Sequence, residues 1–353
     1  MSTPTEETAE GKNREYSEES WSRADKYSKL LGAIPSSFST AIRTLRTNNP
    51  DGAGNGFDKN SRFMADRLIK SPTLKAPVHF AACMLAPDKV TPDAPVSDAV
   101  LLNSLTPHEV ASVLGMIYTY RRVKRLCEGQ LWDNLAKEMH AQSDIGIRLG
   151  KCIPRIGTSV GIVLGSVRWL AMALFLSRDE KGFRAYRREV NAKNKYHDLD
   201  GEMKIWGCDH IQIASKILQT LGFGLPFAAG FSFGLTSTNH TELESDPEYY
   251  RWYCATLWIE ALRKHGKAPD MTHKGAYYPL KEHLDTLGLA VREINSGGSK
   301  FNWLGKEKQD LPSAKKAQAA AAPKEKETEV LETDLPEEVI KEFAEDGEEL
   351  DLE

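Results

Sequence analysis

Two pairs of adjacent acidic and imidazole side chains are the residues best suited to chemistry in this 353-residue chain. Asp209 precedes His210 at the expected start of an apolar helix, in the stretch WGCDHIQIASKIL, and His197 precedes Asp198 in the polar stretch KNKYHDLDGE. Carboxylates and imidazoles are common ligands of catalytic metal ions, so either pair could belong to a metal-dependent hydrolase. Each pair also has a structural interpretation, which has to be weighed beside the catalytic one.

The structural interpretation is favoured for both pairs. Asp209 stands where an N-cap residue accepts backbone N–H bonds and complements the helix dipole. His210, in the first turn, could then hydrogen-bond a neighbouring loop. The pair His197–Asp198 lies between two helical patterns, and such a pair is usually solvated.

Signatures of other reaction types are missing from the sequence. It contains no H-E-x-x-H metal motif, no G-x-S-x-G nucleophile elbow and no glycine-rich phosphate loop of the P-loop or dinucleotide type. The five cysteines are widely spaced and form no C-x-x-C pair, which predicts buried thiols in a reducing compartment. No cofactor is therefore expected.

The elements that must position these residues are expected to be helices. Apolar residues recur at helical spacing from about residue 21, and no stretch alternates as strands do, so the sequence predicts an all-α fold. One helix start is well marked, with Thr106 as N-cap, Pro107 at the first helical position and Glu109 at the capping-box position. A pair of final helices is expected to end near Gly297 and Gly298.

The chain divides into four expected regions. Residues 1–20 are expected to be disordered, 21–130 and 131–300 to form two helical subdomains, and 301–353 to be a low-complexity linker with an acidic tail. From residue 306 onward there are 16 acidic and 7 basic residues, so this segment carries −9 and the remainder +5 of the net −4. The tail is expected mainly to solubilise the protein. The alternative is a docking helix that binds a basic partner groove through Val339, Ile340 and Phe343.

Two apolar stretches, residues 157–175 and 218–236, approach the length that a membrane-spanning helix needs. The first carries Arg168 in its middle and the second is broken by glycines and Pro226, which predicts buried core for both. The polar N-terminus has no apolar region of the kind found in signal peptides. These features predict a cytoplasmic protein, and the small net charge gives nucleic acid no support as a partner.

The order of several segments resembles the HDOD domain, a catalytically silent relative of the HD-type phosphohydrolases found mainly in bacterial signalling proteins. LLGAIPSSFSTAIRTL is similar to its opening helix, and LWDNLAKEMHAQSDIGIRLG to its tryptophan-led helix, with His140 near the position of the family's histidine. GEMKIWGCDHIQIASKILQTLGFGLP resembles the family segment in which an Asp–His pair follows a glutamate. The resemblance covers roughly residues 28–297.

The chain departs from the catalytic relatives in two places. Arg168 and Trp169, in GIVLGSVRWLAMAL, stand where the enzymes carry a His–Asp pair, and arginine has no lone pair to offer a metal. The His–His pair that often follows the last motif is replaced by FAAGFSFGL. The resemblance thus implies a non-enzymatic regulatory module that contacts a protein partner. Its degenerate cleft would be formed by His140, Arg168, Trp169, Trp206, Asp209 and His210.

Two alternatives remain open. The first is a divergent metal-dependent phosphohydrolase, which requires at least four of His140, His197, Asp198, Asp209 and His210 to converge on one cation. The second is a sensor in which Arg168 holds a phosphate or small nucleotide, since guanidinium groups pair well with phosphate. Pairing of Arg168 with a buried carboxylate is favoured over that second alternative.

Overall fold

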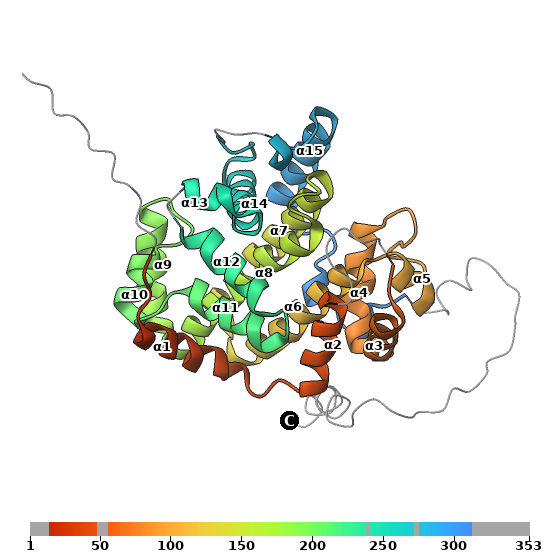
Figure 1. Cartoon of the computed structure of the whole chain (residues 1–353), viewed down its shortest axis with the longest axis horizontal. Coiled ribbons are helices and arrows are strands. Elements are labelled where there is room, and N and C mark those ends of the chain that lie inside the picture. The colour runs from red at the N-terminus through yellow and green to blue at the C-terminus, as the bar shows by residue number, and fades with distance from the viewer. Residues whose placement is uncertain (1–13, 48–55, 238–239, 272–274, 313–353) are drawn as a thin grey trace, which may run out of the picture.

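The computed structural model describes residues 14–47, 56–237, 240–271 and 275–312 (Figure 1). Helices form its regular structure, and these residues contain no strand, which confirms the all-α class. The α-helices are α1 (Glu18–Ser28), α2 (Ser36–Thr47), α3 (Lys59–Ile69), α4 (Pro72–Leu85), α5 (Asp98–Asn103), α6 (Pro107–Leu126), α7 (Gly129–Cys152), α8 (Thr158–Arg178), α9 (Glu180–Ala192), α10 (Leu199–Trp206), α11 (His210–Leu221), α12 (Leu225–Thr236), α13 (His240–Ser245), α14 (Pro247–His265) and α15 (Lys281–Gly297). Four short 3-10 helices accompany them: η1 (Lys29–Leu31), η2 (Gly275–Tyr277), η3 (Trp303–Gly305) and η4 (Lys308–Asp310).

An antiparallel hairpin of α7 and α8 forms the centre of the fold. The two helices approach so closely that a Cβ atom added at Gly146 would lie 2.1 Å from the carbonyl oxygen of Gly161. Gly150 meets Gly157 in the same way one turn further along. The absence of side chains at these positions is what allows the two backbones to touch.

Helix α8 is the core helix of the protein. It is the one described helix long and apolar enough to cross a membrane, and its apolar window is fully buried inside the protein, as in the core of a soluble protein. Arg168, in its middle, is buried as well. The prediction that residues 157–175 form buried core is confirmed.

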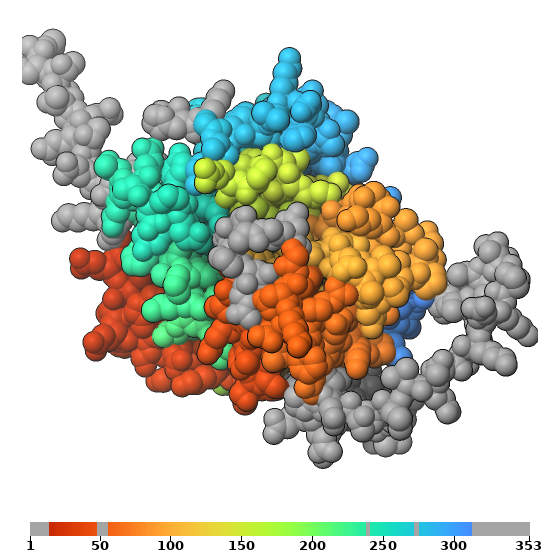
Figure 2. Space-filling model, turned by 45° about the vertical axis from the view of Figure 1, so that its right-hand side comes forward, coloured from red at the N-terminus to blue at the C-terminus, as the bar shows by residue number. Residues whose placement is uncertain are grey.

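The other helices surround this hairpin. In Figure 1, α1 and α9 to α11 lie on one side and α2 to α6 on the other, while α14 and α15 flank α7. The space-filling view shows the blue residues of α15 directly against the yellow-green residues of α7 (Figure 2). Helix α1 packs beside α11, although almost 200 residues separate the two helices in sequence.

Local signals placed several helix ends correctly. Thr106 caps α6, Pro107 is its first residue, and Glu109 completes the capping box, as predicted. Helices α2 and α3 lie in the region where apolar residues were expected to recur at helical spacing. All five cysteines are free thiols; four are buried, and Cys152 is partly exposed.

The N-terminal boundary differs from expectation. Residues 14–20 belong to the stretch 1–20 that we expected to be disordered, yet α1 begins at Glu18 with Ser17 as its cap. Tyr16 packs edge-on against Trp21, with the ring centroids 5.6 Å apart, and hydrogen-bonds Asp209. The hydrogen bond to Asp209 thus fixes residues 14–20 against the rest of the protein, although their composition is polar.

Two other boundaries and the burial of one helix also differ from expectation. The expected pair of final helices is the single helix α15, preceded by η2. Residues 301–312, expected to begin a linker, pack onto α4 and bury Trp303 and Leu304. Helix α12, expected to be buried core, exposes Leu225 and Phe233. The expected docking residues Val339, Ile340 and Phe343 lie outside the described residues.

Candidate functional site

The candidate site is a group of polar side chains where α8, α10 and α11 meet. His197, Glu202 and His210 each bring one potential metal-ligand atom within 4.8 Å of the other two. Glu202 and His210 are fully buried, and His197 is partly buried. The imidazole rings of the two histidines lie face to face at an angle, with centroids 4.4 Å apart.

The local sequence explains why Glu202 and His210 meet. Asp198 caps α10 through a hydrogen bond from the backbone N–H of Gly201. Gly207 ends the helix in the left-handed region at φ 72°, a conformation that costs glycine little. The chain then turns directly into α11, so that residues eight apart in sequence face each other across the turn.

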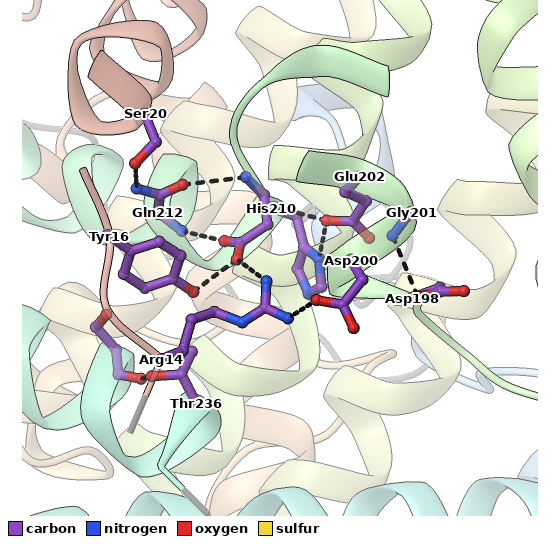
Figure 3. Close-up of polar contacts among 12 residues, drawn as sticks. Arg14, Tyr16, Ser20, Asp198, Asp200, Gly201, Glu202, His210, Gln212 and Thr236 are labelled. Carbon is purple, nitrogen blue, oxygen red and sulfur yellow. Dashed lines mark hydrogen bonds and ion pairs between the residues drawn. The ribbon is translucent and has the colours of Figure 1, made fainter. Parts of the chain in front are cut away.

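Glu202 is the hub of the group. Its Oε2 accepts two hydrogen bonds from His210, one from the backbone N–H at 2.8 Å and one from Nδ1 at 2.7 Å (Figure 3). Its Oε1 accepts a hydrogen bond from the hydroxyl of Tyr186. Burial and the neighbouring carboxylate raise the pKa of Tyr186 far above its ordinary value, so the phenol stays a donor. Both carboxylate oxygens are therefore already engaged within the protein.

Arg168 occupies the other face of His210. Its Nε donates to Nε2 of His210 at 3.4 Å, and its Nη1 donates to Oε1 of Glu260 at 2.8 Å. An accepting Nε2 places the imidazole proton on Nδ1, where it is donated to Glu202. The favoured pairing of Arg168 with a carboxylate is thus found, although Glu260 is about one-third exposed and not buried.

The group has enough donor residues to hold a metal ion, but the donor atoms of Glu202 and His210 are already hydrogen-bonded within the protein. Two histidines and a glutamate form a known zinc ligand set. Here Nε2 of His210 faces a guanidinium, and the oxygens of Glu202 accept bonds from His210 and Tyr186. Burial lowers the pKa of His197 well below its ordinary value, and the positive charge of Arg168 adds to the effect, so this imidazole stays in the neutral form that a metal needs. A cation would have to displace Arg168 and break these bonds.

Asp209 has the structural role that its position predicted. It caps α11 in a reciprocal capping box, in which its Oδ1 accepts from the N–H of Gln212 at 2.9 Å and its own N–H donates to Oε1 of Gln212. Its Oδ2 accepts from Tyr16 at 2.6 Å and lies 3.8 Å from Arg14. Figure 3 shows how Arg14 and Tyr16 approach from the N-terminal segment, beside the bond from Gln212 to Ser20. Burial raises the pKa of Asp209.

The structure brings together some of the other predicted cleft residues and separates the rest. Trp169 lies next to the group, with its ring centroid 5.4 Å from that of His197. Trp206 instead stacks on Phe175 at 4.1 Å. His140 packs against Tyr120 at 5.6 Å, and burial alone lowers its pKa to about 4.

Of the five residues required for a phosphohydrolase, His197 and His210 converge. Asp198 is occupied with its helix cap and with Lys193, at 2.8 Å. Asp209 and His140 have the separate surroundings just described. Within the described residues, His197 and His210 form with Glu202 the cluster that could hold a metal, so the convergence of at least four of the five named residues is not found.

Sequence reasoning missed Glu202 and Glu260, the two carboxylates that the site uses most. Glu202 carried a signal, because it is the glutamate of the same segment that contains Asp209 and His210. Glu260 lies 92 residues beyond Arg168, and no local pattern joins them. No family model, curated protein or solved structure matches this chain.

Proposed function

We propose that this chain is a non-catalytic regulatory module of the HDOD type, acting in the cytoplasm through contacts with a protein partner. The observation that carries the proposal is the guanidinium of Arg168 on Nε2 of His210. This nitrogen is the one that would bind a metal while Nδ1 is oriented by Glu202, the usual arrangement around a metal-bound histidine. Arginine at that place turns a ligand into a hydrogen-bonded structural residue.

The order of the motifs supports the same proposal. The glutamate and histidine that resemble the HDOD segment are hydrogen-bonded to each other through buried atoms. Such a pair stabilises the junction between α10 and α11 without requiring a metal. The HDOD assignment rests on this order and on the loss of the central His–Asp pair.

A divergent phosphohydrolase is the second candidate, because three donors of a known catalytic set lie within 4.8 Å of one another. An assay separates the two candidates. We would incubate the purified chain with bis-p-nitrophenyl phosphate and with cyclic nucleotides, in the presence of Mg²⁺, Mn²⁺, Zn²⁺ or Fe²⁺. The regulatory proposal expects no turnover above the metal-only background. Turnover that disappears in His197→Gln and persists in the exposed control His265→Gln would establish the enzyme instead.

The protein partner calls for a separate test. The acidic tail is expected mainly to solubilise the protein, and the alternative to be tested is docking on a basic groove through Val339, Ile340 and Phe343. Pull-down experiments with the full chain and with a chain ending at residue 312 would compare the recovered proteins. A partner retained only by the full chain, and lost when the three apolar tail residues are replaced by serine, supports docking. Equal recovery by both chains would leave the tail a solubilising segment.

A further inference from the structure

A cavity of about 470 Å³ lies beside the candidate site, and Trp169, whose ring packs near His197, is part of its lining. Its walls come from α7, α8, α9, α14 and α15, and Trp169 and Phe183 are among its lining side chains. The volume falls in the range of small-molecule sites. None of Arg168, Glu202 and His210 is part of its lining, so the cavity is distinct from the His197–Glu202–His210 group.

The charged residues of the cavity wall are mostly cationic. Three cations, Lys137, Arg187 and Arg263, and one anion, Glu138, line it, which leaves a net charge of +2. Arg263 is matched by Glu138, to which it donates through Nε at 3.0 Å and Nη2 at 2.5 Å. The excess positive charge thus resides on Arg187 and Lys137.

Arg187 has no carboxylate within ion-pair distance among the described residues, although it is partly buried. Its Nη1 donates to the carbonyl oxygen of Tyr196 at 2.8 Å, and its guanidinium lies 5.7 Å from the ring centroid of Trp169. Burial lowers its pKa, and the longer-range attraction of Glu138 and Glu202 only partly offsets that effect. A guanidinium has five N–H donors in a fork that matches phosphate, and the hydrogen bond to Tyr196 uses one of them.

The remaining lining is neutral and mixed: amide side chains stand beside apolar ones, which include Leu131, Leu135 and Ile294. Asn134 and Asn191 reach the cavity from α7 and α9, and both are exposed at its edge. The side-chain oxygen of Asn295 is already hydrogen-bonded within the protein, because Oδ1 accepts from Nη1 of Arg263 at 2.7 Å. Lys137 is exposed on α7, beside Asn134 on the rim. Such a lining offers hydrogen bonds to the polar body of a ligand and charge to its anionic end.

We propose that this cavity binds a small phosphate monoester, with Arg187 holding the phosphate and Lys137 adding charge at the rim. A monoester carries between one and two negative charges at neutral pH, which corresponds to the net charge of the wall. The volume exceeds what an inorganic phosphate ion fills, so the ester is expected to carry a polar organic group. The inference deepens the proposed function, because a ligand of this kind is one way for a regulatory module to receive a signal.

Isothermal titration calorimetry on the full chain tests the proposal. The probes are adenosine monophosphate, ribose 5-phosphate, adenosine and inorganic phosphate. We expect both monoesters to bind, and Arg187→Gln to weaken them about tenfold to a hundredfold, as loss of a charge-assisted hydrogen bond predicts. Arg188→Gln, an exposed neighbour outside the cavity lining, is the matched control and should bind as the unchanged protein does.

A second variant keeps the test independent of folding. Lys137→Glu reverses a charge on the exposed rim and should weaken the monoesters at least as clearly, while Lys181→Glu, exposed on α9 and outside the lining, should not. Circular dichroism would check that each variant is folded. The proposal is overturned by adenosine binding as tightly as its monophosphate, by inorganic phosphate matching the esters, by equal affinity in Lys137→Glu, or by no binding of any probe. None of these results depends on the hydrolysis assay, so the two proposals can fail separately.

Discussion

Arg168 and Arg187, two arginines near Trp169, differ in what their guanidinium groups bind. Arg168, on α8, uses its guanidinium internally, on Glu260 and on His210. Arg187, on α9, faces a cavity and bonds one backbone carbonyl. An arginine that is paired with groups of its own chain serves the structure. An arginine that lines a cavity and has no carboxylate partner can instead bind an anionic ligand. The contrast predicts different consequences when each region is altered.

The largest effect is expected at Glu202. Its replacement by alanine leaves the N–H and Nδ1–H of His210 and the hydroxyl of Tyr186 without an acceptor in a buried place. Each orphaned donor costs about 1–3 kcal/mol, so we expect a loss of at least about 3 kcal/mol in the free energy of unfolding. Urea denaturation monitored by circular dichroism would measure it. Glu189→Ala, at an exposed position on α9, is the control. If Glu202→Ala lowered the free energy of unfolding no more than Glu189→Ala does, Glu202 would not be the hub of the group.

Arg168→Met comes next in size. It leaves Nε2 of His210 without its donor and Glu260 without its cation. Because Glu260 is about one-third exposed, water replaces part of the lost pairing, and we expect about 2 kcal/mol of destabilisation. Arg184→Met, which removes an exposed pair with Glu180, should stay within about 0.5 kcal/mol in the same urea measurement. Equal losses in the two variants would contradict the internal role of Arg168.

The pH dependence of stability should report on His197. Its folded-state pKa is depressed by burial and by Arg168, so below the unfolded value of about 6.5 the unfolded chain binds the extra proton. The stability from neutral His197 is therefore fully present above about pH 6.5 and falls as the pH decreases. The slope can reach about 1.4 kcal/mol per pH unit. Urea denaturation at several pH values should show a shallower acid-side loss for His197→Gln, and an identical slope would contradict this account.

Arg187→Gln should have the smallest effect on stability. The variant loses one hydrogen bond to the carbonyl of Tyr196 and a cation–π contact with Trp169, and it also relieves a partly buried charge. We expect a change within about 1 kcal/mol in the free energy of unfolding. Thermal and urea denaturation would both reveal it. A loss as large as that of Arg168→Met would mean that Arg187 is itself a structural residue.

Features that depend on a few neighbouring residues could be predicted from the sequence. The cap at Thr106 follows from its spacing to Glu109 and the cap at Asp209 from its place before an apolar helix, and both form as expected. The all-α class follows in the same way from spacing along each helix. The structural role of Asp209 could therefore be favoured before any fold was known.

Features that depend on distant residues could not be predicted. The pairing of Arg168 with a carboxylate was expected, but its identity as Glu260 requires the packing of α14 against α8. His140 was placed in the cleft from its position in the sequence, yet α7 turns its ring toward Tyr120. The cavity around Arg187 is assembled by five helices, and no single segment carries a sign of it.

The metal content of the purified chain tests the central claim most directly, namely that the His197–Glu202–His210 group is held by its own hydrogen bonds and by Arg168. Inductively coupled plasma mass spectrometry on protein prepared without chelators would measure Mn, Fe, Co, Ni, Cu and Zn per chain. The account predicts amounts well below one per chain, unchanged in His197→Gln. One transition metal per chain, lost in that variant, would contradict it and would make the group a metal centre.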